Sequence, residues 1–256
     1  MLAKLLLISQ YTFREIFKSK ILYITLFIGI ALMVMTYVAT EFTYGTPDKV
    51  ALDFGLGMLS LSSLGISLFL GATLLPNEIN SRTVYMVISR PVPRWVFIMG
   101  KILGLIAILL INVLILSLMT LACSYLLGGE VSSVTIWAIV FNCLEAILLL
   151  LVVVFLSLFL NTTLATVVSL LILLLGHAIK ETQETSFVKL RGYLNTVLEA
   201  YHLILPGFYK LNLKDFAIYQ KTIETSYLVN SFLYGTFYSL FLLSLIIFIF
   251  NRKNID

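Results

Sequence analysis

Six long apolar runs dominate the chain and decide what it can fold into. They cover approximately residues 21–40, 54–76, 100–127, 134–160, 164–180 and 227–250. Hydrophobic residues make up 60% of the sequence and charged residues 12%, whereas a soluble domain is roughly 45–50% apolar and about 25% charged. About 20 consecutive apolar residues suffice for one bilayer-spanning helix. The sequence therefore predicts an all-α integral membrane protein with six transmembrane helices, in a single domain over residues 1–256.

The basic residues predict the topology of these spans. They gather before the first span, between the second and third spans, and after the last span, as Lys4, Arg14, Lys18, Lys20, Arg82, Arg90, Arg94, Lys101, Arg252 and Lys253. Because cytoplasmic loops carry an excess of Lys and Arg, we expect both termini to be cytoplasmic, in the inner (cytoplasmic) membrane. The net charge of +4 does not indicate nucleic acid binding, since the positive residues are spread among loops.

Two segments outside the spans have helical patterns of their own. Residues 1–20 place Leu2, Leu5, Leu6, Phe13, Ile16 and Phe17 on one helical face and Lys4, Arg14, Glu15 and Lys18 on the other. This pattern predicts an amphipathic helix lying in the cytoplasmic interface, in contact with lipid. In residues 181–226, Pro206-Gly207 separates two runs with apolar residues at helical spacing. They predict two short helices on the outer face.

The cytoplasmic segment over residues 77–99 reads NEINSRTVYMVISRPVPRWVFIM. Val84, Val87 and Ile88 share one helical face, whereas Pro91 and Pro93 prevent the helix from continuing, because each lacks an N–H and disfavours helix in the residue before it. The segment therefore predicts a short helix followed by a rigid turn. From the residues alone, a positive loop that only holds the topology is the favoured interpretation.

The same segment resembles a family motif. Glu78, Arg82-Thr83, the run from Ile88 to Arg94 (ISRPVPR) and Gly100-Lys101 are similar to the acid, "GT", "LSRPVSR" and "GK" pattern between spans two and three of type-2 ABC transporter permeases. Arg82 stands where the family often has Gly. The six spans, the amphipathic start and the long outer segment before the last span resemble that family over the whole chain.

The resemblance implies that this segment is the coupling helix, seated in a cleft of a cytoplasmic ATPase. The residues implied in coupling are Glu78, Arg82, Thr83, Val84, Val87, Ile88, Arg90, Pro91 and Arg94. It also implies two ATPase subunits and a second permease copy, identical or similar, as partners in export by alternating access. ATP and Mg²⁺ would bind the ATPase. This chain has no phosphate-binding G-x-x-x-x-G-K-[ST] sequence, so we expect it to be neither an enzyme nor a cofactor-binding protein.

Two sets of small polar residues allow two interpretations. Ser60, Ser63 and Ser67 follow one face of the second span, and Thr166 and Ser169 follow one face of the fifth. Small residues let helices pack closely. The resemblance instead implies a translocation path, because the first, second and fifth spans of two permease copies surround the path in that family.

Glu145 lies near the middle of the fourth span. A carboxylate within the membrane is costly unless it is protonated or partnered, so it is a candidate translocation residue. A structural role, with Asn112 or Asn142 as the hydrogen-bonding partner, is the alternative.

Other chemistry finds little support in the sequence. Glu199-x-x-His202 has the spacing of a metal-ligand pair but occurs once, so no metal site is expected. We find no H-E-x-x-H or G-x-S-x-G protease motif. The alternatives to a permease are a secondary transporter or channel, and a non-transporting assembly or sensor protein that docks an extracytoplasmic protein on its outer segment. The spans are uniformly apolar, so the sequence does not indicate the substrate.

Overall fold

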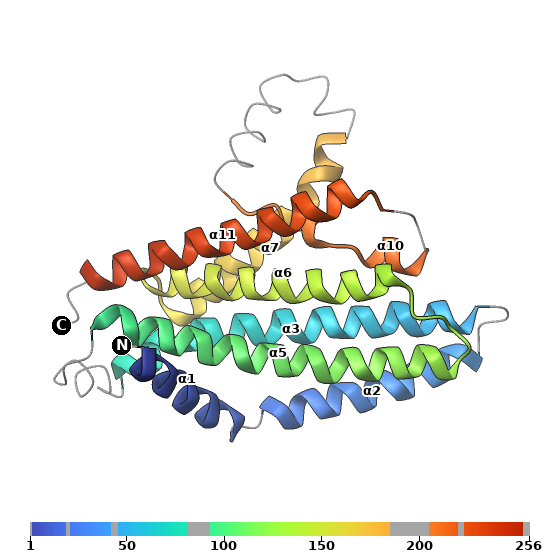
Figure 1. The fold of residues 1–256 in the computed structure, drawn as a ribbon, viewed down its shortest axis with the longest axis horizontal. Helices are drawn as coiled ribbons and strands as arrows, with labels where there is room; N and C mark the ends of the chain where they lie inside the picture. Colours follow the sequence, from blue (N-terminus) through green and yellow to red (C-terminus); the bar gives the residue numbers. More distant parts are fainter. Residues whose placement is uncertain are drawn as a thin grey trace.

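The computed structural model describes residues 2–18, 21–41, 46–80, 93–184, 205–219 and 223–252, with residues 21, 22, 75–80 and 179–184 described by their backbone alone. Within these residues the chain is all-helical, as predicted (Figure 1). The elements are α1 (Leu2–Phe17), α2 (Ile21–Glu41), α3 (Pro47–Asn80), α5 (Arg94–Leu126), α6 (Ser133–Ser157), α7 (Thr162–Glu184), the 3₁₀ turn η1 (Phe208–Leu211), α10 (Lys214–Ile218) and α11 (Thr225–Arg252).

Five of these helices, α2, α3, α5, α6 and α11, are long and apolar enough to cross a membrane. By length and composition the chain is therefore a multi-pass membrane protein. The apolar part of α7 is shorter, covering Thr162–Ala178. Six spans were predicted from the sequence. The run at residues 164–180, which became α7, is shorter than the other five.

The long helices run side by side, with α1 and the C-terminal end of α11 at the same end of the bundle (Figure 1). Helix α3 lies at the centre and packs most extensively against α6 and α5. Buried aliphatic side chains fill the space between them, including Ile102 and Ile108 of α5 and Leu149 of α6, each 0% exposed. These contacts hold α3 between two other helices along much of its length.

Helices α3 and α5 extend beyond the predicted spans. Helix α3 begins at Pro47 and continues past Pro76 to Asn80, whereas an end near Pro76 was predicted. Helix α5 begins directly after its N-cap residue Pro93, whose ψ of 142° is extended rather than helical. An apolar run marks only the lipid-facing part of a helix, and proline is well tolerated at the first helical position. Both ends of the 77–99 segment are therefore helical, whereas residues 81–92 lie outside the described residues.

Helix α1 forms where a helix was predicted, and one side of it packs on α5. Leu5 and Thr12 are buried against α5, while Leu2 and Leu6 are 78% and 65% exposed. The contact is made at two glycines of α5, where a Cβ atom on Gly104 would lie 2.6 Å from Thr12 Cβ and one on Gly100 would lie 2.8 Å from Ile8 Cβ. The Gly-x-x-x-Gly pair thus gives α1 a groove to pack into.

The segment around η1 and α10 contains a short helix, α10, within the second predicted run, and it is buried more deeply than the sequence indicated. Short helices on the outer face were expected, but Phe208, Leu211, Leu213 and Ala217 are each no more than 1% exposed and pack into the bundle. The predicted break at Pro206-Gly207 is present. The first of the two predicted helices, at about residues 190–205, lies outside the described residues except for Leu205.

Candidate functional site

Glu145 lies at the centre of α6, twelve residues from Ser133 and twelve from Ser157. At 1.5 Å per residue, each end of the helix is about 18 Å away. The residue is 3% exposed, and its Oε1 lies 3.2 Å from Nε2 of His177 on α7. The sequence had left Asn112 or Asn142 as structural partners for this carboxylate, whereas the structure pairs it with His177.

His177 is held by two further contacts. Its Nδ1 lies 3.2 Å from the carbonyl oxygen of Leu173, one turn earlier in α7. Its ring stacks on Phe208 of η1, with centroids 6.1 Å apart and planes 12° apart. Because a carbonyl oxygen only accepts hydrogen bonds, Nδ1 carries a proton in this contact. Nε2 is thereby the nitrogen turned toward the carboxylate.

The segment from Pro206 to Lys210 is attached to α7 and α11. A Cβ atom on Gly176 of α7 would lie 2.7 Å from the carbonyl oxygen of Pro206, so only glycine permits this approach. The backbone N–H of Gly207 donates to Tyr234 Oη of α11 at 2.8 Å, and Lys210 Nζ lies 4.4 Å from the centroid of the Tyr234 ring. In the same segment, burial, helped by neighbouring tyrosines, raises the pKa of Tyr209.

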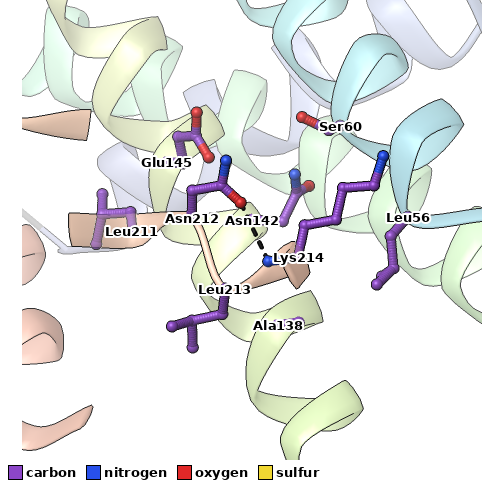
Figure 2. A pocket seen from close by; sticks show the side chains of 9 residues that line it. All are labelled: Leu56, Ser60, Ala138, Asn142, Glu145, Leu211, Asn212, Leu213 and Lys214. Atoms are coloured by element: carbon purple, nitrogen blue, oxygen red, sulfur yellow. Dashed lines mark hydrogen bonds between the residues drawn. The ribbon is translucent and has the colours of Figure 1, made fainter. Parts of the chain in front are cut away.

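A cavity of about 50 Å³ adjoins Glu145 (Figure 2). It is lined by Leu56 and Ser60 of α3, Ala138, Asn142 and Glu145 of α6, and the stretch Leu211, Asn212, Leu213 and Lys214. A water molecule needs roughly 10–15 Å³ of such volume, whereas sites for drug-sized ligands span about 300–1,000 Å³. The cavity therefore holds a few water molecules and is too small for a substrate of that size.

The wall of this cavity runs from buried to exposed residues. Glu145 is buried and Ser60 is partly buried, whereas Asn212 is exposed. The side chain of Lys214 is 35% exposed, and its Nζ lies 2.7 Å from Asp53 Oδ1 of α3. The Lys214 backbone N–H donates to Asn212 Oδ1 at 3.1 Å, which holds the turn into α10 (Figure 2). One cavity thus joins the buried carboxylate to an exposed turn.

Polar contacts also join α3 to α6 and to α5, and α2 to α5. Ser63 Oγ donates to Asn142 Oδ1 on α6 at 3.0 Å, and Ser67 Oγ lies 2.8 Å from the carbonyl oxygen of Ala146. Asn112 Oδ1 on α5 accepts from Thr25 at 2.8 Å and from Ser62 at 3.1 Å. Interhelical hydrogen bonds of this kind contribute on average about 0.6 kcal/mol each. They fix the position of α3 against α5 and α6.

The structure places the predicted path residues at two kinds of location. Ser60 and Glu145 line the cavity, and Ser63 adjoins it through Asn142. The hydroxyls of Thr166 and Ser169 instead donate to carbonyl oxygens one turn earlier in their own helix α7. Ser63 and Ser67 also support the packing interpretation, since their contacts hold α3 close to α6.

Most predicted coupling residues are outside the described part of the chain: Arg82, Thr83, Val84, Val87, Ile88, Arg90 and Pro91. Arg94 is the first residue of α5, and Glu78 belongs to the last turn of α3 by its backbone. Glu199 and His202, from the metal-ligand pair considered above, also lie outside the described residues. Among the described residues, no group of three or more His, Cys, Asp and Glu is placed to hold a metal ion.

Sequence reasoning missed the roles of His177, Asn212 and Lys214. For His177 a signal was present: Glu145 lies twelve residues before the end of α6, and His177 lies fifteen residues after the start of α7. In a hairpin of two helices these positions differ in depth by only about 4.5 Å. Asn212 and Lys214 had no such signal, because a loop pattern does not indicate burial.

No protein-family model matches this chain, and no curated protein matches it. The fold and the Glu145 cluster define a helical, multi-pass membrane protein whose bundle encloses a small polar cavity.

Proposed function

We propose that this chain is the transmembrane subunit of an ATP-driven transporter of the type-2 ABC class. In this proposal it pairs with a second permease, identical or similar, and binds two cytoplasmic ATPase subunits, which carry ATP and Mg²⁺. The direction of transport is export. The chain itself transmits the motion of the ATPase subunits to the spans and forms the translocation path, and in this proposal it has no catalytic residue.

Six spans with both termini in the cytoplasm are part of this proposal. Helix α7 serves as the remaining span, since its apolar stretch Thr162–Ala178 continues as helix to Glu184. Its length of 23 residues corresponds to about 35 Å, enough for the hydrocarbon core. The exposed leucines of α1 and its basic residues Arg14 and Lys18 support an interfacial position for that helix.

The observation that carries the proposal is the motif over residues 77–101 and where its ends lie in the fold. The motif joins the end of α3 to the start of α5, and α3 is the helix that contacts both α6 and the cavity. A force applied to this segment would therefore act directly on α3. Positive residues in and beside the segment suit the cytoplasmic side, where an ATPase would be.

The test is the double substitution Val84→Asp/Ile88→Asp. Burial of one such apolar side chain contributes about 1.5–3 kcal/mol, so loss of both should weaken ATPase attachment by several factors of ten. The measurement is copurification of an ATP-hydrolysing chain from the native host in mild detergent. Arg90 and Arg94 are retained, so the charge bias that sets topology is largely kept.

The matched control is Val131→Asp, which makes the same kind of change in the exposed turn at the other end of the bundle. It should leave ATPase attachment unchanged. Undiminished ATPase binding and hydrolysis in the double variant, at a membrane level equal to that of the parent, would reduce residues 77–99 to a topological loop and remove the main support for the proposal.

A secondary transporter is the second candidate, favoured by one observation. Buried ionisable pairs within spans are what ion-coupled transporters use, and Glu145 with His177 is such a pair. Transport that persists in ATP-depleted vesicles with an imposed ion gradient would favour this candidate over the ATP-driven one.

A further inference from the structure

We propose that Glu145 and His177 form a proton-binding site that exchanges protons with the outer side of the membrane through the adjoining cavity. The proposal starts from the number of protons that this geometry requires. His177 Nδ1 carries one proton toward Leu173, and Nε2 lies 3.2 Å from Glu145 Oε1. Glu145 Oε1 is buried and has no other hydrogen-bond partner in the described part of the chain, so we place a second proton between Nε2 and Oε1.

The occupied site is therefore neutral overall, either as imidazolium and carboxylate or as imidazole and carboxylic acid. Release removes the shared proton to a water molecule in the cavity. It leaves a carboxylate and a neutral imidazole that keeps its proton on Nδ1. The site then carries one negative charge at the centre of α6, where an unpaired charge is costly.

The cavity provides the exchange route. Its volume of about 50 Å³ admits water, and its wall reaches from Glu145 to exposed Asn212. Lys214 lines the same cavity, and its ammonium is paired with the Asp53 carboxylate. Ser60 and Asn142 supply further hydrogen-bonding groups for water along the wall.

Other titratable groups lie around the site in the described part of the chain. They are Asp53 of α3, Cys143 of α6, Lys210 and Lys214 of the η1–α10 segment, and Tyr234 of α11. Asp53 is paired with Lys214, and the Tyr234 hydroxyl accepts from Gly207. Helix α5 contributes no titratable side chain between Lys101 and Cys123. Glu145 is thus the ionisable group at the buried end of the cavity, and His177 lies beside it.

The chain contains two histidines, which makes the test direct. In purified protein with ¹⁵N-labelled histidine, His202→Gln leaves His177 as the single imidazole signal. The ¹⁵N shifts distinguish the charged ring from each neutral tautomer, and we expect Nδ1 to stay protonated while the Nε2 signal changes with pH. Glu145→Gln should move the midpoint of that change by about one pH unit, a tenfold change in proton affinity.

A second variant tests the route separately. Ser60→Leu fills part of the cavity that Glu145 also lines, so exchange of the Nε2 proton with solvent should slow by roughly tenfold or more. Gly65→Leu is the matched control, since it adds the same bulk to α3 where no neighbouring atom lies within 4 Å. If Glu145→Gln does not fold, Glu145→Asp retains the acid and should also move the midpoint.

The proton-binding site would be refuted by a His177 signal that is constant between about pH 5 and pH 9. It would also be refuted by a midpoint that is the same in the parent and in the Glu145 variants. Equal exchange rates in Ser60→Leu and Gly65→Leu would overturn the route. No ATPase enters these measurements, so their failure leaves the proposed function untouched, and the loss of that function leaves proton binding intact.

Discussion

The contact between α1 and α5 allows a prediction whose magnitude follows from the structure. Replacing Gly104 by Ala puts a Cβ atom 2.6 Å from Thr12 Cβ and 3.0 Å from the carbonyl oxygen of Ser9. Carbon atoms in contact are normally about 3.5–4.0 Å apart, so α1 must retreat by about 1 Å. Overpacking of this kind typically costs about 1–3 kcal/mol.

The matched control is Gly65→Ala in α3, where a Cβ atom meets nothing within 4 Å. Both substitutions gain the same helix propensity, about 1 kcal/mol per residue, so their difference isolates the collision with Thr12. A difference of 1–3 kcal/mol corresponds to a roughly 5- to 150-fold increase in the population with α1 detached.

Two assays measure this difference. Thermal unfolding in detergent gives the loss of stability, and brief trypsin digestion reports exposure of α1 through cleavage after Arg14, which lies in the last turn of the docked helix. We expect Gly104→Ala to be cleaved faster than the parent and Gly65→Ala to be cleaved at the parental rate. Identical unfolding and cleavage in the two variants would show that the glycine groove does not hold α1.

The remaining predictions concern the buried pair and the topology. His177→Leu should lower the free energy of unfolding by about 3–5 kcal/mol, because it leaves Glu145 buried with no described partner. Adding Glu145→Leu should recover most of that stability in thermal unfolding. If the losses of the two single variants instead add in the double variant, the two residues are not a coupled pair. In a variant without its native cysteines, a cysteine at exposed Glu130 should react with an impermeant thiol reagent in intact cells, and one at exposed Asn161 should not; the reverse pattern would invert the proposed orientation.

The positions of the helices could be predicted from the sequence because crossing a membrane is a local requirement. A span needs a continuous apolar run, and such runs predicted α2, α3, α5, α6 and α11. The predicted ends lie within four residues of the observed ones, except that α3 and α5 begin seven and six residues earlier than predicted. The start of α5 after Pro93 and the break at Pro206-Gly207 also follow from local backbone chemistry. The early start of α3 at Pro47 was missed, because Asp48, Lys49 and Asp53 interrupt the apolar pattern outside the hydrocarbon region.

Only the tertiary structure decided which polar groups meet. Whether Glu145 is paired with His177, Asn112 or Asn142 depends on how α6 and α7 are rotated about their axes, which hydropathy does not specify. The burial of Phe208 against His177 depends on the space that Gly176 leaves for Pro206. Helix formation and membrane insertion are set by neighbours along the chain, whereas these contacts are set by neighbours in space, so the sequence predicted the bundle and the structure supplied the site within it.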